Sequence, residues 1–379
     1  MPSRRASVSM KDVAALAGVS IGTVSNVLNS PDLVSDATRS RVEKAIAQLG
    51  WVRNESARQL RAGRSRSIGM VVMDVANPFF TDIVSGVEDY VHDLGYSVQL
   101  GNSAQQTERE AAHVQLFEQH RVRGLLLAPI KEVGQQVDAL RRHRIPVVIV
   151  DRAAKDAPYC SVAVDDVDGG RLAVDHLVAQ GHRNIAFVGG PMTIQQVRDR
   201  HLGAQLALSR VGDSGYLTTI STERLDTGSG TVAAAELVAL PAAERPTAVF
   251  AANDLLAIGL LQGFFTNGFS VPEKISLIGY DDIDFAAAAA VPLSSIRQPR
   301  HALGVRAAEL LFAEIEALDN DTRHEHQHIE FAPELVVRRS TARAQTWTGR
   351  HRSSSVGAGH NETLQTSSLP ASVTALSES

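Results

Sequence analysis

Few side chains in this chain of 379 residues are grouped in a way that would support catalysis. Asp281 and Asp282 are adjacent carboxyl groups, which are the residue types of a general acid–base pair. Because consecutive residues after a strand point in different directions, these two are not expected to face one substrate. The sequence has no GxSxG or P-loop motif, and the glycines at positions 228 and 230 lack the rest of a dinucleotide-binding fingerprint. We therefore predict no catalytic residues and no cofactor.

Three alternating histidines are the second group with possible chemistry. In a strand, His324, His326 and His328 would share one face and could bind a metal ion. Exposed histidines at the start of a strand are the more common arrangement, and no clustered cysteine or acid completes a ligand set in the sequence. Cys160 lies among apolar residues and is interpreted as a small buried hydrophobic residue, not a nucleophile. The sequence therefore predicts no metal site.

The composition limits the class of protein. A single cysteine permits no internal disulfide and suits a reducing compartment. No apolar run approaches the ~20 residues of a membrane span, and the first residues lack the apolar segment of a signal peptide. We expect a cytoplasmic protein with no membrane partner.

Charge is distributed unevenly along the chain. The net charge is −5, but residues 1–66 contain 11 lysines and arginines against 5 acidic residues, a balance of +6. The remainder therefore has a balance of −11. A small basic segment on an acidic body can bind phosphate while the body stays in solvent.

The basic segment is predicted to contain three helices. Residues 10–29 should form two short helices around a tight turn at Gly18, with Ser9 and Ser20 as their N-caps. A third helix is expected from Ser35 to Gly50. Apolar residues at helical spacing should face a shared core: Val13, Leu16, Ala17, Val24, Val27, Leu28, Val42, Ala45, Ile46 and Leu49. The pattern fits a helix-turn-helix, whose second helix lies in the DNA major groove, or an ordinary helical hairpin.

Residues 53–66 differ from the helices before them. They are basic, and their stretch of helix formers is too short to be stable alone in water. The segment is either a charged linker or a linker that becomes helical when a partner orders it. Leu60 is its one large apolar residue, of the type that DNA-kinking proteins insert between base steps.

From Ser67 onward, apolar strands alternate with helices. This pattern predicts parallel, doubly wound sheets, and the number of strands favours two α/β lobes with a ligand cleft between them. Residues 342–379 are rich in small polar residues and are expected to be disordered. The strands are expected at 68–75, 97–100, 124–128, 147–150, 161–164, 185–188, 248–251, 276–279 and 294–297, and helices at 79–92, 108–120, 168–179, 200–208, 255–265 and 301–317.

Several segments of the sequence form a recognisable set. Residues 12–29 and 34–65 read DVAALAGVSIGTVSNVLN and VSDATRSRVEKAIAQLGWVRNESARQLRAGRS. Further segments are NPFF, IVDR, HLVAQGHRNIAFVGGP, FAANDLLAIG and ISLIGYDDID, which begin at residues 77, 149, 176, 250 and 275. Together they resemble the LacI/GalR family of transcriptional regulators, and the resemblance spans roughly residues 9–340.

This resemblance implies an α/β fold class, with a three-helix helix-turn-helix headpiece and a two-lobed periplasmic-binding-protein-like core. It implies a repressor at the bacterial nucleoid that binds double-stranded operator DNA as a homodimer, under the control of a small-molecule effector; tetramers are not expected. The implied divisions are an arm at 1–8, a headpiece at 9–52, a hinge at 53–66, a core at 67–341 and a tail at 342–379. The N-lobe is expected at 67–162 and 293–322, and the C-lobe at 163–292 and 323–341.

By resemblance, Ile21, Gly22 and Asn26 face base edges, while Thr23 and Ser25 hold phosphates. Gly22 has no side chain, and Ile21 is suited to apolar contact with a thymine methyl group. Asn26 can pair with adenine, which is worth roughly 1–3 kcal/mol of discrimination. Much of the specificity should therefore come from the hinge and from DNA shape.

In the hinge, Ala57 matches the family's minor-groove contact and Leu60 matches its leucine wedge. Arg58 would lie nearby, close to phosphates. The resemblance also implies a set of effector-binding residues, which comprises Phe79, Phe80, Asp151, Asp165, Arg200, Asn253, Asp254, Asp281 and Gln298.

The effector is expected to be a sugar or related polyol rather than a purine. Several family members stack an aromatic ring on the ligand just before the helix that begins here near Ser229. This chain has Leu225 or Asp226 at that place, and no aromatic residue between Tyr216 and Phe250.

Two other classes of protein share such a core. A transport solute-binding protein would carry a signal peptide and no basic headpiece. An enzyme on a doubly wound fold would need a nucleophile, metal or cofactor constellation. The sequence favours the regulator over both.

Overall fold

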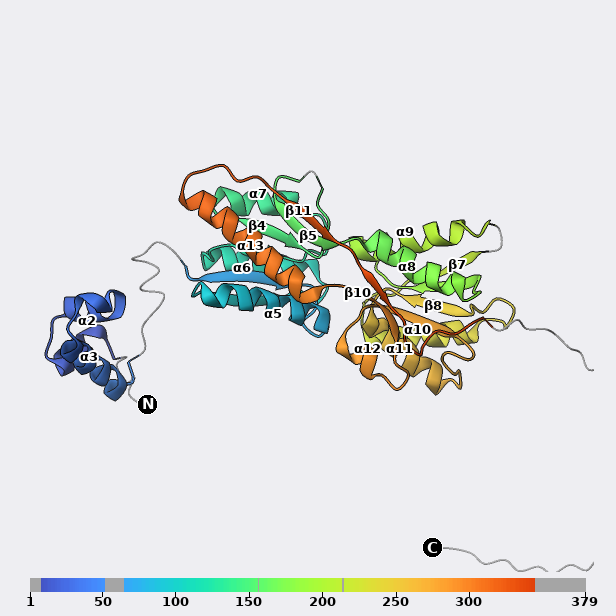
Figure 1. Ribbon diagram of the computed structural model, residues 1–379, viewed down its shortest axis with the longest axis horizontal. Coiled ribbons are helices and arrows are strands. Elements are labelled where there is room, and N and C mark those ends of the chain that lie inside the picture. Colours follow the sequence, from blue (N-terminus) through green and yellow to red (C-terminus); the bar gives the residue numbers. More distant parts are fainter. Residues whose placement is uncertain (1–7, 52–64, 156, 213–214, 345–379) are drawn as a thin grey trace, which may run out of the picture. The chain divides into compact units, whose positions relative to one another are not determined.

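The computed structural model describes residues 8–51, 65–155, 157–212 and 215–344 (Figure 1). These residues form a helical headpiece and two α/β lobes. The described residues contain no helix long and apolar enough to cross a membrane. The expectations for most of the arm, for the hinge at 53–64 and for the tail from 345 fall outside the described residues.

The headpiece contains the three predicted helices, α1 (Met10–Ala17), α2 (Ile21–Asn29) and α3 (Asp36–Leu49), with a 3-10 turn, η1 (Pro31–Leu33), between the last two. The predicted caps are confirmed. Ser9 and Asp12 form a capping box, and the Ser20 hydroxyl accepts from the backbone N–H of Thr23 at 3.0 Å. Gly18 has a φ of 64°, which glycine adopts without strain.

One predicted core position in the headpiece is wrong. Leu16 is 46% exposed, and Ala14 is buried in its place. The reason is geometric, because α2 and α3 meet α1 along the side that carries Val13, Ala14 and Ala17. The headpiece core is otherwise as expected and includes Val24, Val27, Val42 and Ala45.

The first lobe is a parallel six-stranded sheet in the order β11-β5-β4-β3-β1-β2. Its strands are β1 (Ser67–Val72), β2 (Ser97–Asn102), β3 (Leu125–Leu127), β4 (Val147–Val150), β5 (Cys160–Val164) and β11 (His328–Phe331). Its helices are α5 (Pro78–Asp93), α6 (Thr107–Gln119), α7 (Gly134–Arg142) and α13 (Arg300–Asp319). Met70 and Val72 lie in one buried cluster with α5 and α13, whereas Val71 lies in another with α6 and α7. This alternation buries both faces of the sheet.

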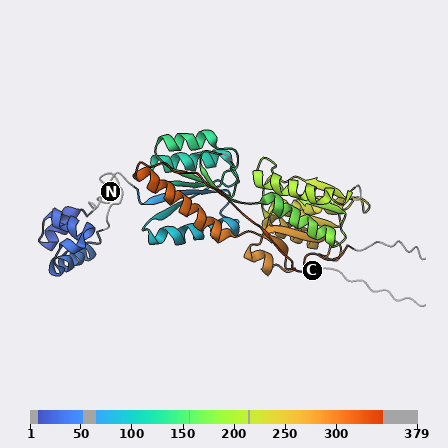
Figure 2. The ribbon, with the colours of Figure 1, turned by 45° about the horizontal axis from the view of Figure 1, so that its top comes forward.

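The second lobe repeats this plan in the order β12-β10-β9-β8-β6-β7, with β12 antiparallel to β10. Its strands are β6 (Asn184–Val188), β7 (Tyr216–Ile220), β8 (Ala248–Ala251), β9 (Ser276–Asp281), β10 (Ser294–Arg297) and β12 (Glu334–Val336). Its helices are α8 (Asp166–Ala179), α9 (Gln195–Ser209), α10 (Thr227–Ala239), α11 (Asp254–Thr266) and α12 (Asp284–Ala288). Helices cover the sheets of both lobes (Figure 2).

The sheets differ from the expected lobe boundaries. β10 belongs to the second sheet and β11 to the first, whereas the predicted ranges placed them the other way round. The chain therefore changes lobe after β5, between β10 and α13, and between β11 and β12. Composition cannot reveal this, because both strands are only four residues long and mix polar with apolar side chains, so they fit either sheet equally well.

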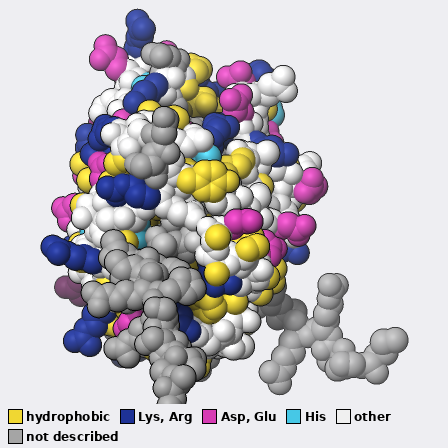
Figure 3. Space-filling model, turned by 90° about the vertical axis from the view of Figure 1, so that its right-hand side faces the viewer, with side chains coloured by type: hydrophobic (Ala, Val, Ile, Leu, Met, Phe, Trp, Pro, Cys, Tyr) yellow, Lys and Arg dark blue, Asp and Glu magenta, His cyan; other side chains and the backbone are white. Residues whose placement is uncertain are grey.

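The surface of the body carries both signs of charge. On the face shown in Figure 3, basic and acidic side chains are interspersed with hydrophobic ones. Such mixing is typical of a surface that faces solvent rather than phosphate.

Candidate functional site

The second helix of the headpiece has an exposed face. Ile21 is 45% exposed, and Gly22 and Asn26 are also exposed. A Cβ added at Gly22 would meet nothing closer than the Ser20 hydroxyl at 3.6 Å, so the surface there is open. The three residues expected to face bases therefore lie on the side of α2 away from the headpiece core.

The two residues expected to hold phosphates are braced within the same helix. The Thr23 hydroxyl lies 2.9 Å from that of Ser20, and the Asn29 amide donates to the Ser25 hydroxyl at 3.1 Å. The side chains of Thr23 and Ser25 are half-buried. Ala57, Arg58 and Leu60 lie outside the described residues, so their expected contacts stay predictions.

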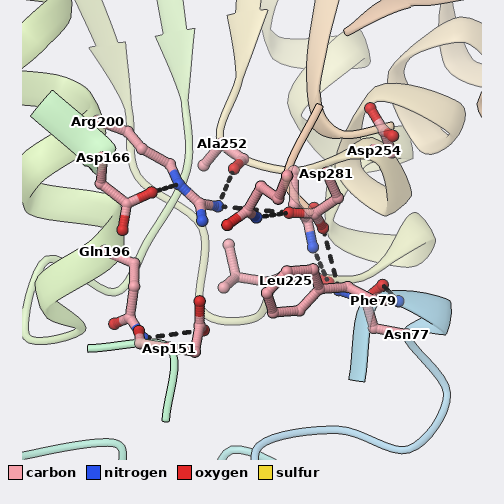
Figure 4. A network of polar contacts seen from close by, with 12 residues as sticks. Asn77, Phe79, Asp151, Asp166, Gln196, Arg200, Leu225, Ala252, Asp254 and Asp281 are labelled. Atoms are coloured by element: carbon pink, nitrogen blue, oxygen red, sulfur yellow. Dashed lines mark hydrogen bonds and ion pairs between the residues drawn. The ribbon is translucent and has the colours of Figure 1, made fainter. Parts of the chain in front are cut away.

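A second site of interest lies where the strands of both lobes end, and Arg200 of α9 is its central cation (Figure 4). Its guanidinium donates to a carboxylate oxygen of Asp166 at 2.7 Å and to the backbone carbonyl of Ala252 at 2.7 Å. The same group stacks 3.7 Å from the centre of the Tyr280 ring and lies 3.9 Å from Asp281. Arg200 is 4% exposed, so these contacts hold it in one orientation.

Asp281 links the two lobes. It ends β9 with a φ of 108° and accepts hydrogen bonds from Gln298 at 2.7 Å and from Asn77 at 3.2 Å. Asn77 is the N-cap of α5 in the first lobe, whereas Asp281 ends β9 and Gln298 follows β10 in the second.

Asp151 forms another link between the lobes. It follows β4 of the first lobe, and Gln196 of α9 in the second lobe donates to its carboxylate at 3.0 Å and also to its backbone carbonyl. Phe79 and Leu225 lie between the Asp151 and Asp281 links (Figure 4). The expected residues Phe79, Asp151, Arg200, Asp281 and Gln298 are thus brought together.

Four other expected residues hold elements in place. Asp254 is fully buried and accepts from the backbone N–H of Ile283 at 2.9 Å and the hydroxyl of Ser295 at 2.7 Å. Its carboxylate lies apart from the Arg200 contacts (Figure 4). Asn253 caps α11 and donates to Leu225 at 3.2 Å, Asp165 caps α8, and Phe80 packs edge-on against Phe79.

Three polar members of the site were not predicted. Asn77, Asp166 and Gln196 were missed, although Gln196 lies in the first turn of a helix that follows a strand. This position is the sequence signal for Gln196, because ligands in doubly wound folds bind at the carboxyl ends of strands. We use the term interlobe cluster for Asn77, Asp151, Asp166, Gln196, Arg200, Asp281 and Gln298.

The interlobe cluster is rich in buried oxygen atoms that can accept hydrogen bonds. It contains three buried carboxyl groups, those of Asp151, Asp166 and Asp281, and one guanidinium. Burial raises the pKa of all three acids, to about 6 for Asp281 and well above the ordinary value for Asp151. The side-chain oxygens of Gln196 and Gln298 are buried and have no hydrogen-bond partner among the described residues. The cluster is therefore suited to a ligand with several hydroxyl or N–H donors.

Two cavities lie at the lobe junction. The larger, of about 610 Å³, is lined by residues of both lobes, including Ala153, Gln195 and Glu330, and by no residue of the interlobe cluster. A smaller one of about 30 Å³ shares these three residues and is lined also by Asp166 and Gln196. The smaller cavity therefore connects the cluster to the larger one.

The elevated pKa of Asp281 predicts a specific pH dependence. Its folded pKa of about 6 exceeds the ordinary 3.8, so between these values the folded chain holds a proton that the unfolded chain has lost. The free energy of unfolding should therefore decrease as pH rises through this window, by about 2–3 kcal/mol from this group. Asp281→Asn should remove that part of the slope in urea unfolding at a series of pH values. Asp284→Asn, at a side chain that is 99% exposed, is the control, and equal slopes in wild type and Asp281→Asn would contradict this prediction.

Comparison with known proteins gives family matches to the headpiece and to the lobes. Residues 9–54 match the model of "Bacterial regulatory proteins, lacI family", and residues 174–341 match "Periplasmic binding protein-like domain". The "HTH-type transcriptional repressor PurR" of Vibrio atlanticus is 33% identical over 330 residues, which are 87% of this chain and 97% of that protein.

Solved structures are similar over the same span. The lac repressor dimer bound to operator and the anti-inducer ONPF has a TM-score of 0.74 and 29% identity, covering 89% of this chain and all of that one. A LacI family regulator from Enterococcus faecium with bound ribose has a TM-score of 0.65 and 29% identity, covering 74% of this chain and all of that one.

Proposed function

Because this chain belongs to the LacI family of bacterial transcriptional regulators, which are not enzymes, we propose that it binds a palindromic operator as a homodimer under the control of a sugar or related polyol. It is a DNA-binding transcriptional repressor regulated by an effector. The proposal concerns the form of the operator, the assembly and the chemistry of the effector.

The observation that carries the proposal is the group of buried oxygen acceptors in the interlobe cluster, two of which have no partner among the described residues. Sugar hydroxyl groups can donate to Asp151, Asp281 and the unpartnered oxygens of Gln196 and Gln298. An anionic ligand would face three carboxyl groups against one arginine, so it is disfavoured. The Enterococcus faecium relative with bound ribose supports a sugar by similarity.

A purine is the alternative effector. A flat ring is best held between two apolar faces, and Phe79 offers one of them. Leu225, half-buried beside it, is aliphatic where an aromatic residue would complete the stack. This pairing favours a sugar, whose apolar ring face packs on one aromatic side chain while its hydroxyl groups face acids and amides.

Control of DNA binding would follow from linkage between lobe closure and the hinge. The two lobes are joined by Asn77–Asp281, by Gln196–Asp151 and by the Arg224 side chain, which donates to the carbonyl of Ala104 at 3.2 Å. A ligand that replaces some of these bonds changes how the lobes meet. The first lobe begins directly after the hinge, so its movement changes the pairing of hinges in the dimer. Such coupling is typically worth about 1–3 kcal/mol.

Asn26→Ala tests the DNA-reading part of the proposal. Loss of a bidentate contact to adenine should weaken operator binding by about 5- to 150-fold for each half-site and should abolish preference at one base pair of each half-site. The operator is first selected from a pool of random duplexes, and affinities are then measured by fluorescence anisotropy. Gln48→Ala, which truncates an exposed amide side chain on α3 of the same headpiece, is the matched control. If the Asn26 variant kept the full base preference, this residue would not read the operator.

A further inference from the structure

A second cluster of chemically active side chains lies in the first lobe. It comprises Cys160 at the start of β5, Glu314 on α13, and His324 and His326 in the segment before β11. One donor atom from each of the four lies within 4.8 Å of the others. The Cys160 sulfur is 3.2 Å from Nε2 of His324 and 3.8 Å from Nδ1 of His326. We call these four residues the Cys–His cluster.

Pairing of distant strands assembles this cluster. β11 lies parallel to β5 with His328 opposite Ser161, so the residues just before β11 run beside Cys160. α13 brings Glu314 to the same place. The sequence expectation of no completing cysteine or acid is therefore corrected, because Cys160 and Glu314 lie more than a hundred residues apart in the chain and are joined by the fold.

Glu314 gives an independent indication of a ligand. It is 5% exposed, and its Oε2 atom has no hydrogen-bond partner among the described residues. Burial raises its pKa to about 7. A buried acid without a donor is unfavourable, and a bound cation would provide the missing partner.

A cavity beside the Cys–His cluster gives a metal ion access to it. The guanidinium of Arg141 is a cation that competes with the ion for this place. A cavity of about 720 Å³ is lined by Glu314, His324 and His326, and it provides a path from solvent. Arg141 lines the same cavity, and its guanidinium lies 3.4 Å from Nε2 of His326. Metal binding at Nδ1 of His326 places a proton on Nε2, so Arg141 must turn away when the ion binds.

We propose that Cys160, Glu314, His324 and His326 form a binding site for a transition-metal dication, with Zn²⁺ as the best fit. A thiolate, two imidazoles and a carboxylate are the donors that Zn²⁺ takes in tetrahedral sites. Bond lengths of about 2.0–2.3 Å in a tetrahedron separate the donor atoms by about 3.3–3.8 Å. The distances from sulfur to the two histidine nitrogens, 3.2 and 3.8 Å, lie close to this range.

Cobalt is the direct probe of this site. Full-length protein, freed of metal with a chelator and reduced, is titrated with Co²⁺ alone. We expect one equivalent to bind, with a thiolate-to-cobalt charge-transfer band in the near ultraviolet and the strong visible bands of a tetrahedral ion. Zn²⁺ should displace Co²⁺, so that the visible bands disappear, and should raise the melting temperature of the protein. Absence of the charge-transfer band in folded protein would overturn the proposal.

Substitutions separate this site from adventitious surface binding. Cys160→Ser should remove the charge-transfer band, and His326→Gln and Glu314→Gln should each weaken Co²⁺ binding at least tenfold. His328→Gln is the matched control, since His328 faces the hydroxyl of Ser161 at 3.0 Å and lies outside the cluster. Circular dichroism verifies that each variant is folded. Equal Co²⁺ affinity in wild type and His326→Gln, or equal loss in His328→Gln, would overturn the proposal.

Discussion

Replacing Arg200 with methionine is expected to lower the free energy of unfolding by about 3–5 kcal/mol at neutral pH. The substitution leaves the buried carboxyl groups of Asp166 and Asp281 without their cation, and the carbonyl of Ala252 without its donor. Methionine preserves much of the side-chain volume beside Tyr280, so the loss reflects charge more than packing. Urea unfolding followed by circular dichroism measures the change.

The loss should also depend on pH. Burial raises the pKa of Asp166 and Asp281, so both acids take up protons as pH falls and need the guanidinium less. The effect of Arg200→Met should therefore be smaller near pH 5 than at neutral pH. Arg198→Met is the control on the same helix, since its side chain is 57% exposed and should change stability by less than about 0.5 kcal/mol. A loss of equal size in both variants, or one independent of pH, would contradict this account of Arg200.

Leu60→Ala is expected to weaken binding to the selected operator by roughly 10- to 100-fold, with little change in binding to random duplex DNA. A leucine wedge contributes when the DNA is kinked at the centre of a palindrome, whereas binding to random DNA depends on phosphate contacts. Fluorescence anisotropy with both duplexes at one salt concentration measures the two effects.

Leu100→Ala is a matched control for this substitution. Leu100 is an exposed leucine of β2 in the first lobe, 44% accessible to solvent, and its truncation should leave both affinities unchanged. An equal loss of operator and random-DNA binding by Leu60→Ala would argue against a wedge.

Local signals made much of the fold predictable. Capping at Ser9 and Ser20 depends on neighbours three residues away, and both caps were correctly expected. The interior strands β1, β4 and β8 are continuous apolar runs and were found near their observed bounds. Strands β7, β11 and β12 were missed, because each is partly exposed and lacks such a run.

The site was less accessible to sequence reasoning, because its bonds join distant residues. Family resemblance led to Arg200, Asp151 and Asp281. Asn77 was missed because its partner Asp281 lies 204 residues along the chain. The same resemblance placed Asp254 at the ligand, yet its oxygens accept hydrogen bonds from donors within its own lobe. Position after a strand indicates nearness to a cleft, whereas side-chain direction depends on the packed neighbours.

The central claim is that the interlobe cluster and the DNA-binding headpiece share one linked equilibrium. Its most direct test is the reciprocity of binding. A panel of pentoses, hexoses, disaccharides and purines is first screened for binding to full-length protein by calorimetry. Operator affinity is then measured with and without the ligand that binds, and ligand affinity with and without operator. We predict that a sugar binds and that both affinities change by the same factor, roughly 5- to 150-fold. A ligand that binds the interlobe cluster with equal affinity in the presence and absence of operator would contradict the account.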